Sequence, residues 1–395
     1  MLANKIATIT PSLTLGISTK VNEMKKQGIS IINLSIGEPD FHTPEAAKKG
    51  GIDAIEANLT RYDAASGLHD LRVAICDKLN HENHLDYTPQ EIVVTSGAKH
   101  AITNALIAIL NPGDEVIIPK PFWVSYPEMV KLTGGKPVFV ETRLSNNFKM
   151  TAEELTAAIT PTTKALILTN PSNPTGAIYT REELMAIAEI CVARNIIIIA
   201  DEIYERICYL DSFTSIASLS PAVKALTIII NGLAKSAAMT GWRIGYTASS
   251  LELAKAMGMI QGHLVSHPAT ISQYAALKAL TDSAADMAKM VETYKARRDE
   301  IVALLSDIPG LSIVQPDGAF YIFMDLSALQ EKLPHQGSFS VELCNRLLED
   351  YQVAFVPGVA FGMDTFIRMS YATDMASIKE GLGRLKDFYL KVLEG

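Results

Sequence analysis

The chain has 395 residues, of which 48% are hydrophobic and 20% charged, and its formal net charge at pH 7 is −8. This length predicts roughly two or three domains of about 100–200 residues each. The negative charge disfavours nucleic acid as a partner but leaves small acidic substrates open. The cysteines are widely spaced, without a metal-ligand pattern, and no apolar run is long enough to cross a bilayer. We therefore expect a cytoplasmic protein with reduced thiols, no metal site and no membrane association.

The N-terminal part of the chain contains an apolar stretch at residues 31–37, which we expect to fold back onto a C-terminal domain. From about residue 90, short apolar runs alternate with segments of helical periodicity, at residues 98–110, 151–160 and 181–195. Each run is brief, β-branched and closed by turn residues, as is typical of strands buried on both faces. The predicted strands lie at residues 91–95, 114–119, 136–141, 164–169, 195–200, 225–230 and 243–248.

This alternation predicts an α/β domain with a mostly parallel, doubly wound, seven-stranded sheet. Ligands of such sheets bind beyond the carboxyl ends of the strands, so the informative residues should follow the strands directly. Nearer the C-terminus the pattern changes, with a long amphipathic helix predicted at residues 283–308. Strands at 318–326 and 352–357 and helices at 339–350 and 375–394 follow it. We interpret these elements as a smaller α+β domain.

The first turn that follows a strand is TSGAKHA, residues 95–101, where a strand stops and a helix begins. An anion can be held by backbone N–H groups at the positive end of the helix dipole, here those of Ser96, Gly97, Ala98 and Lys99. Taken alone this pattern is not specific, because many strand–helix turns are merely tight.

Two further turns carry polar residues. NPSNPTG, residues 170–176, is a rigid turn that is either purely structural or aims the Asn173 amide into the ligand crevice. In ADEIY, residues 200–204, an apolar strand runs directly into two acids, and a buried acid must be paired, capping or functional. Asp201 is therefore either the N-cap of a helix or part of a site, with Tyr204 one turn further on.

The stretch NGLAKSAAMTGWRIGY, residues 231–246, places Lys235 at the end of an apolar run among small residues. A buried unpaired lysine is costly, whereas a lysine that forms an imine carries its charge only conditionally. An anion bound near this stretch would explain why an arginine stands at position 243. The alternative is a solvated surface loop, which the apolar lead-in and the small flanking residues disfavour.

Together these residues form the set that pyridoxal phosphate requires. Lys235 supplies the amine for the imine, and Asp201 would keep the pyridine nitrogen protonated. Tyr204 and Asn173 would hydrogen-bond the phenolic oxygen of the ring and stabilise its anion. The expected cofactor is therefore pyridoxal 5′-phosphate.

The phosphate of this cofactor would be bound by Arg243 and the turn at residues 96–99. Trp123 follows the predicted strand at 114–119. We expect its ring to stack on the cofactor, although an aromatic residue at this point can also be ordinary core.

With these motifs the chain resembles the fold-type I pyridoxal-phosphate enzymes, specifically the class I aminotransferases and, among them, the bacterial aspartate aminotransferases. The resemblance covers essentially the whole chain and rests on LSIGEPDF, RYDAASG, TSGAK, PFWVSYPEM, NPSNPTG, DEIYE, NGLAKSAAMTGWRIGY, PDGAFY and IRMSYA, in the family's order and spacing. It implies an N-terminal arm at residues 1–12, a small domain at 13–44 and 296–395, and a large cofactor-binding domain at 45–295.

The resemblance also implies roles for individual residues. Lys235 corresponds to the Schiff-base lysine, which moves a proton between the substrate Cα and the C4′ carbon of the cofactor. Arg368 matches the arginine that clamps the substrate α-carboxylate, and Gly37 the glycine whose backbone approaches that carboxylate. Tyr62 matches a tyrosine that reaches the phosphate of the neighbouring subunit's cofactor. This implies an obligatory homodimer with shared active sites.

Substrate choice is implied by a second group of residues. Lys99 resembles the group that meets the distal carboxylate of aspartate or glutamate, and Thr14 assists from the N-terminal part of the chain. Trp123 and Asn173 belong to the substrate site as well as to the cofactor site. A charged partner for the distal carboxylate favours dicarboxylic substrates, because an unpaired buried charge penalises the others.

The chain departs from the family pattern at residues 261–273, where relatives more often have Ser-, Thr- and Asn-rich segments. His263 and His267 fall in a segment that lines the neighbouring subunit's pocket in relatives. They either make ordinary interface hydrogen bonds or alter the substrate specificity.

The predicted reaction is a ping-pong transamination from an amino acid, in the first place aspartate, to 2-oxoglutarate. Alternatives on the same scaffold are aminotransferases for aromatic, prephenate-like or broader substrates and a carbon–sulfur β-lyase. A transcription regulator built on this fold would need a DNA-binding domain ahead of the arm, which we do not expect. A nicotinamide-linked dehydrogenase would need GxGxxG after an early strand, and the sequence lacks it.

Overall fold

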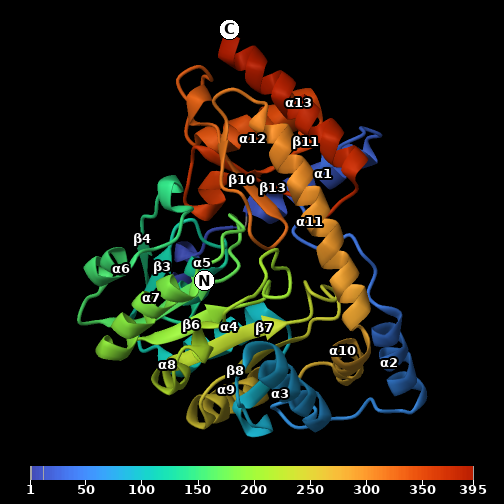
Figure 1. Cartoon of the computed structure of the whole chain (residues 1–395), viewed down its shortest axis with the longest axis vertical. Helices are drawn as coiled ribbons and strands as arrows, with labels where there is room; N and C mark the ends of the chain where they lie inside the picture. Colours follow the sequence, from blue (N-terminus) through green and yellow to red (C-terminus); the bar gives the residue numbers. More distant parts are fainter. Residues whose placement is uncertain (1, 12, 395) are drawn as a thin grey trace.

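The computed structural model describes residues 2–11 and 13–394. Its larger sheet has seven strands in the order β2-β8-β7-β6-β5-β3-β4 (Figure 1). β8 runs antiparallel to both of its neighbours, and the other pairings in this sheet are parallel. The predicted mostly parallel seven-stranded sheet is therefore confirmed. Its strands are β2 (Ile92–Thr95), β3 (Glu115–Pro119), β4 (Lys136–Val140), β5 (Thr163–Thr169), β6 (Ile197–Asp201), β7 (Thr227–Gly232) and β8 (Gly245–Ala248).

Two strand ends differ from the prediction for local reasons. β7 begins at Thr227 instead of residue 225 because residues 221–226 form helix α8 (Pro221–Leu226). β8 begins at Gly245 instead of residue 243, since Arg243 has a φ of 57°, which lies outside the extended region.

Alternate residues of the central strands pack on opposite faces of the sheet, which is why each strand reads as an unbroken apolar run. Ile199 of β6 packs with one set of helices, whereas its neighbour Ile198 packs with the other set. The first set is α4 (Ala98–Ile109), α5 (Tyr126–Leu132) and α9 (Leu251–Leu264). The second set is α6 (Ala152–Ala158), α7 (Arg181–Arg194) and α8.

A third group of helices packs against the β2–β8 end of this sheet. It consists of α2 (Glu45–Glu56), α3 (His69–Asn83) and α10 (Thr270–Asp282). The linker between α2 and α3 contains Tyr62, and the segment between α9 and α10 contains His267.

The smaller part of the molecule holds an antiparallel sheet of order β12-β13-β10-β9, above the larger sheet in Figure 1. Its strands are β9 (Ser312–Ile313), β10 (Tyr321–Asp325), β12 (Val356–Pro357) and β13 (Phe366–Ser370). In addition, β1 (Ile32–Asn33) pairs in parallel with β11 (Val353–Ala354), so the N-terminal stretch does fold back onto the C-terminal part. The helices here are α1 (Leu13–Lys26), α11 (Ala284–Ser306), α12 (Phe339–Tyr351) and α13 (Met375–Glu394).

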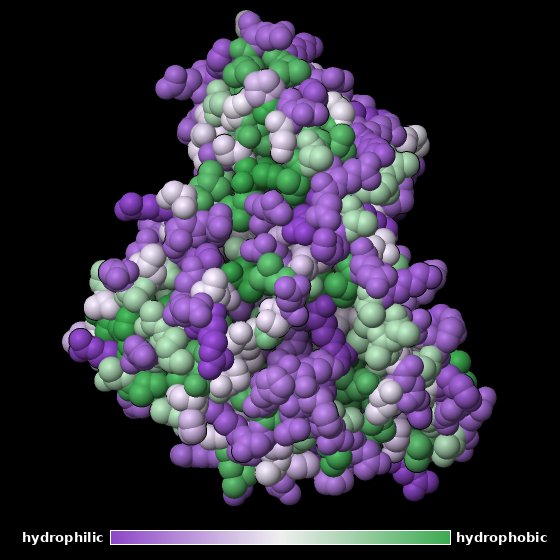
Figure 2. Space-filling view, in the orientation of Figure 1, coloured by the Kyte–Doolittle hydropathy of each residue, from purple (hydrophilic) through white to green (hydrophobic). Residues whose placement is uncertain are grey.

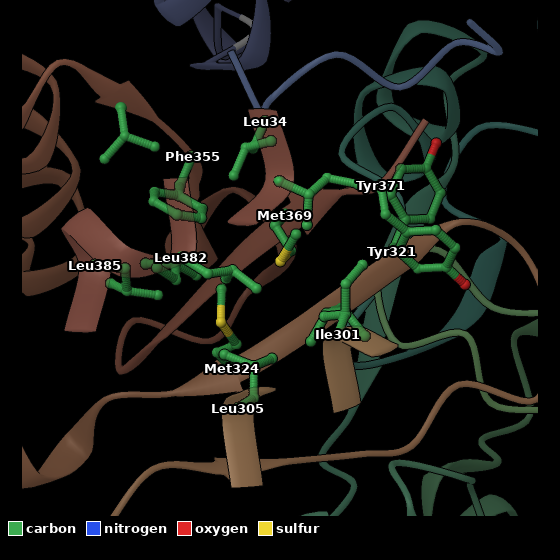
Figure 3. Packing of buried hydrophobic residues seen from close by; sticks show 14 of the residues in the cluster. Leu34, Ile301, Leu305, Tyr321, Met324, Phe355, Met369, Tyr371, Leu382 and Leu385 are labelled. Carbon is green, nitrogen blue, oxygen red and sulfur yellow. The ribbon is translucent and has the colours of Figure 1, made fainter. Parts of the chain in front are cut away.

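One core joins these elements. Figure 3 shows Leu34, close after β1, packed near Met369 of β13 and near Phe355 and Leu382, while Ile301 and Leu305 of α11 lie below them. Tyr321 and Tyr371 lie at the edge of the same cluster. In the view of Figure 2 most of the surface is hydrophilic, and hydrophobic residues gather at the level of β10 and β13.

Short 3₁₀ helices complete the chain: η1 (Asn4–Thr8), η2 (Pro89–Glu91), η3 (Leu144–Asn146), η4 (Ile216–Ser218), η5 (Ser327–Leu329) and η6 (Gly358–Phe361). The segment before α1 lies against α5, where the Thr10 amide donates to Glu128 Oε2 at 3.0 Å and Lys131 Nζ donates to the Thr8 carbonyl. α1 itself packs in the smaller part. This segment therefore runs from the larger sheet's helices to the smaller sheet's helices.

None of the helices in the described ranges is long and apolar enough to cross a membrane. Within residues 2–11 and 13–394 there is also no group of three or more His, Cys, Asp and Glu side chains placed to hold a metal ion. The four cysteines are free thiols; Cys76, Cys191 and Cys344 are buried, whereas Cys208 is partly exposed.

Candidate active site

A cavity of about 570 Å³ lies between the two parts of the molecule, with walls from both sheets. Because β2, β5, β6 and β7 run parallel, their carboxyl ends meet at one edge of the larger sheet. β8 runs the other way, so its amino end lies at that same edge. The predicted residues that line the cavity are Thr14, Gly37, Ala98, Lys99, Trp123, Asn173, Asp201, Tyr204, Lys235, Arg243 and Arg368.

Lys235 follows β7 and faces this cavity. Its Nζ donates a hydrogen bond to the Gly37 carbonyl and lies 5.7 Å from the centre of the Phe320 ring. Removal from bulk water, and secondly the charge of Arg368, lower the pKa of the Lys235 amine to about 8. About a tenth of this amine is therefore uncharged at pH 7, far more than for an ordinary lysine, and a nucleophile or general base acts in that form.

Asp201 ends β6 and is buried at the edge of the cavity. It accepts hydrogen bonds from the Tyr126 hydroxyl at 2.6 Å and from the Ile203 amide at 3.3 Å. Burial outweighs these bonds and raises the pKa of Asp201 to about 6. The alternative that Asp201 caps a helix is wrong, because residues 203–206 form turns.

Tyr126 is a site residue that sequence reasoning missed. Its hydroxyl also pairs with Thr169 Oγ1 at 2.6 Å, so it joins the ends of β5 and β6. It sits in the motif PFWVSYPEM, but nothing in that motif shows that the chain returns to Asp201. Only the parallel order of β3, β5 and β6 brings the two together.

Arg368 of β13 is buried and reaches the cavity from the smaller sheet. Its Nη1 donates to Asn173 Oδ1 at 3.1 Å and its Nη2 to the Ser35 carbonyl at 2.9 Å. Its Nε is buried without a hydrogen-bond partner among the described residues. Burial lowers the pKa of Arg368, and its guanidinium lies 4.4 Å from the centre of the Tyr321 ring. An unpartnered cationic donor of this kind is a binding group for a carboxylate.

Tyr204 lies beside this arginine. Its hydroxyl hydrogen-bonds the Tyr321 hydroxyl at 2.7 Å, and burial raises the pKa of Tyr204 well above its ordinary value. Tyr321 is a second residue that sequence reasoning missed. A side chain at Gly37 would place its Cβ 2.8 Å from the Tyr321 hydroxyl, so a glycine at that position leaves room for the backbone.

The turn after β2 corrects one expectation. The Ser96 amide donates to His100 Nδ1 at 3.2 Å, and the Gly97 amide donates to the Thr95 carbonyl at 2.8 Å, so neither is free for an anion. Neither residue is part of the cavity wall, which includes Ala98 and Lys99. The first turn of a helix has N–H groups without helical partners, so the two amides at the start of α4 are the ones available.

Two glycines shape the space around these amides. A Cβ at Gly97, where φ is 87°, would lie 2.5 Å from Arg243 Nη2, so only glycine lets this guanidinium approach the turn. A Cβ at Gly245 would lie 2.5 Å from the Ala98 nitrogen. The Arg243 guanidinium and the start of α4 thus form a cradle, which side chains at positions 97 and 245 would fill. A cradle of this composition suits a phosphate.

The outer wall carries Lys99, whose Nζ lies 4.9 Å from the centre of the Trp123 ring. Burial, and secondly the charge of Arg243, lower the pKa of Lys99. Thr14 and Ser18 of α1 complete this side, and the Ser18 hydroxyl donates to the Thr14 carbonyl at 3.1 Å. Ser18 had no recognisable signal in the sequence.

Tyr62 does not line the cavity of its own chain, and 91% of its surface is exposed. His263 is also exposed, whereas His267 is half-buried with its ring edge-to-face to Tyr62 at 5.8 Å between centres. These residues lie at the β2–β8 end of the molecule.

The fold and the cavity define an α/β enzyme that takes a small anionic ligand at the carboxyl edge of its larger sheet. The chain belongs to the family "aminotransferase class I and II", whose model matches residues 29–385.

Individual relatives match over their full length. The chain is 47% identical to an aspartate aminotransferase of Bacillus sp. (strain YM-2), covering 98% of this chain and 99% of the relative. It is 43% identical to an aspartate/prephenate aminotransferase of Cereibacter sphaeroides, covering 98% of each.

Among solved structures, the aspartate aminotransferase of Thermus thermophilus with maleate superposes with a TM-score of 0.93 at 40% identity, covering 98% of this chain and 99% of that chain. The aspartate aminotransferase of Rhizobium meliloti superposes with a TM-score of 0.94 at 41% identity, covering 98% of each.

Proposed function

We propose that this protein is a pyridoxal-phosphate-dependent aspartate aminotransferase that passes the amino group to 2-oxoglutarate by a ping-pong mechanism. The observation that carries the proposal is Lys235, whose pKa is lowered to about 8 in one cavity with Asp201 and the unpartnered Nε of Arg368. The names of the full-length relatives support aspartate as the amino donor.

The residues present fit pyridoxal phosphate. Lys235 would hold it covalently, Asp201 would face the pyridine nitrogen, and Tyr204 with Asn173 would face the phenolic oxygen. Arg243 and the Ala98 and Lys99 amides would hold its phosphate in the cradle that Gly97 and Gly245 leave open, and Trp123 would cover the ring. When bound, this group supplies an aldehyde for the substrate nitrogen and a ring that accepts electrons from Cα.

The protein's own groups then have distinct tasks. Arg368 binds the substrate α-carboxylate through its free Nε edge, and Asn173 fixes the arginine through the hydrogen bond at 3.1 Å. The Lys235 amine removes the proton from the substrate Cα, since its lowered pKa leaves it in part as the free base. The Gly37 carbonyl, which accepts a hydrogen bond from this amine, orients it.

Lys99 would pair with the distal carboxylate of aspartate, with Thr14 and Trp123 as neighbours on the same wall. An apolar substrate would leave this ammonium unpaired, which costs binding energy. Prephenate is a second candidate acceptor, favoured by the relatives named aspartate/prephenate aminotransferases.

We also propose a homodimer in which Tyr62 reaches the partner's cofactor phosphate. The exposure of 91% leaves the Tyr62 ring unburied within its own chain. At the end of α9, a few residues before the His267 ring that contacts Tyr62, Leu264 and Val265 are 55% and 45% exposed. Apolar surface of this kind is typical of an interface. The division into an arm, a small domain and a large domain at the boundaries given above belongs to the same proposal.

The test uses purified protein saturated with pyridoxal phosphate, aspartate and 2-oxoglutarate, with glutamate formation as the readout. Parallel reactions replace aspartate with aromatic amino acids, or 2-oxoglutarate with prephenate. Glutamate formed from aspartate supports the proposal. Release of pyruvate and ammonia without an oxo-acid acceptor would instead identify a β-lyase and overturn it.

A further inference from the structure

The linker that carries Tyr62 is held at Arg61, Asp63 and Ala65 by hydrogen bonds from α9, from α10 and from the segment between them. Thr270 Oγ1 donates to the Arg61 carbonyl at 3.0 Å, His267 Nε2 accepts from the Asp63 amide at 3.2 Å, and Gln261 Nε2 donates to the Ala65 carbonyl at 2.5 Å. All three hydrogen bonds involve backbone groups of the linker, and none involves the Tyr62 hydroxyl.

These hydrogen bonds restrict the backbone on both sides of Tyr62. The backbone groups of residues 61, 63 and 65 are held against the protein, and Tyr62 between them is 91% exposed. The three hydrogen bonds thus fix the backbone from which the Tyr62 side chain extends, and the neighbouring Arg61 and Asp63 are exposed as well.

His267 makes the middle one of these three hydrogen bonds, and the contacts of its ring assign a role to each ring nitrogen. Its Nδ1 lies 2.7 Å from the Pro268 carbonyl, which can only accept, so Nδ1 carries the proton. Nε2 is then the lone-pair nitrogen, and this agrees with its position as acceptor for the Asp63 amide. The ring also contacts Tyr62 edge-to-face, with 5.8 Å between ring centres and an interplanar angle of 90°.

We propose that His267 is a positioning residue that holds Tyr62 in the orientation needed to reach the cofactor phosphate of the neighbouring subunit. The inference rests on the proposed function and its dimer, and it gives His267 a task in cofactor retention. His267 acts through Tyr62 and touches neither cofactor nor substrate.

Two variants separate the contacts of His267. His267→Gln retains an acceptor near the place of Nε2 but loses the ring, whereas His267→Phe retains a ring but loses the acceptor. Because the hydrogen bond from the Asp63 amide is what we propose positions Tyr62, we expect His267→Gln to keep the wild-type affinity for pyridoxal phosphate. We expect Phe to weaken it by about 3- to 10-fold, the worth of one hydrogen bond.

The measurement is the dissociation constant of pyridoxal phosphate from the apo-dimer, by absorbance titration, in both the wild-type and the Tyr62→Phe background. If His267 acts through the Tyr62 hydroxyl, His267→Phe has no further effect once that hydroxyl is gone, so the double-mutant cycle is non-additive. Thr270→Val loosens the same linker from another residue and should show a smaller loss with the same dependence on Tyr62.

Three results overturn the inference. They are an unchanged affinity in His267→Phe, an equal loss in His267→Gln and His267→Phe, and a loss that persists in the Tyr62→Phe background. If the wild-type protein itself does not bind pyridoxal phosphate, the proposed function fails first. If the wild-type protein binds pyridoxal phosphate but the variants do not respond as described, only the role of His267 is overturned.

Discussion

Arg368 Nη1 donates a hydrogen bond to Asn173 Oδ1 at 3.1 Å, although the two residues are 195 positions apart. The arginine comes from β13 of the smaller sheet, and the asparagine from the turn after β5 of the larger sheet. The bond therefore ties the two parts of the molecule together at the point where we place the substrate α-carboxylate.

Replacing Arg368 tests this placement. Arg368→Lys keeps the charge but loses the two-pronged geometry and the contact with Asn173. We expect kcat/KM for aspartate to fall roughly 100-fold, equivalent to about 2–3 kcal/mol of transition-state stabilisation. Steady-state kinetics measure this effect, and the affinity for pyridoxal phosphate serves as the control because it should change little. An unchanged kcat/KM would remove Arg368 from the substrate site.

Lys235→Ala should abolish turnover, since Lys99, the other lysine among the described residues that line the cavity, lies on the outer wall beside Trp123. Borohydride reduction of the wild-type enzyme should leave a pyridoxyl group on the peptide that contains residue 235, detectable by mass spectrometry. Lys99→Ala is the matched control, since it removes a lysine of the same cavity and should leave that labelling intact. Normal turnover in Lys235→Ala would contradict the mechanism.

Asp201→Asn should stabilise the apoprotein above pH 6 while it impairs catalysis. Burial raises the pKa of Asp201 from 3.8 to about 6, so the folded state favours the protonated carboxyl. Its contribution to stability is complete below pH 3.8 and is lost as the pH rises through 6. We expect the free energy of unfolding to favour the variant by on the order of 1–3 kcal/mol at pH 7.5.

Urea unfolding of both apoproteins at pH 4.5 and pH 7.5 measures this change. The other titratable groups are common to both proteins, so the difference between the two reports the Asp201 carboxyl together with its charge interaction with Lys235. A gap that is the same at both pH values would show that the Asp201 carboxyl is not perturbed in this way.

Lys99→Met should change the choice of substrate more than the overall activity. Loss of the ammonium removes the partner of the distal carboxylate and the penalty against apolar side chains. We expect kcat/KM for aspartate to fall about 10- to 100-fold, while the value for phenylalanine is unchanged or rises. The ratio of the two specificity constants is the readout. A parallel fall for both substrates would mean that Lys99 does not discriminate between them.

The shared active site can be tested by mixing two defective proteins. A dimer of one Lys235→Ala subunit and one Tyr62→Ala subunit contains one site with both an intact lysine and an intact tyrosine. Random reassortment should restore roughly a quarter of wild-type activity at limiting cofactor. Unmixed variants are the controls. No recovery, despite exchange of subunits shown by mass spectrometry, would mean that Tyr62 does not serve its partner.

The sequence predicted those features that depend on local pattern. All seven strands of the larger sheet could be located. The inner strands are buried on both faces and are therefore apolar throughout, whereas β4 at the sheet edge is partly exposed. The turns that carry Asn173, Asp201 and Lys235 could be identified as candidates because polar residues directly follow such strands. Strand ends were less exact, as at Arg243, where a positive φ delays β8.

Only the tertiary structure decided which of these groups meet. Nothing in the sequence indicated three hydrogen bonds. The Tyr126 hydroxyl donates to Asp201, the Ser96 amide donates to His100, and the Asp63 amide of the Tyr62 linker donates to His267. Hydrophobic periodicity indicates which residues are buried, and it depends only on residues a few positions apart in the chain. A hydrogen bond between distant residues depends on strand order and loop path, and these follow from the packing of the whole chain.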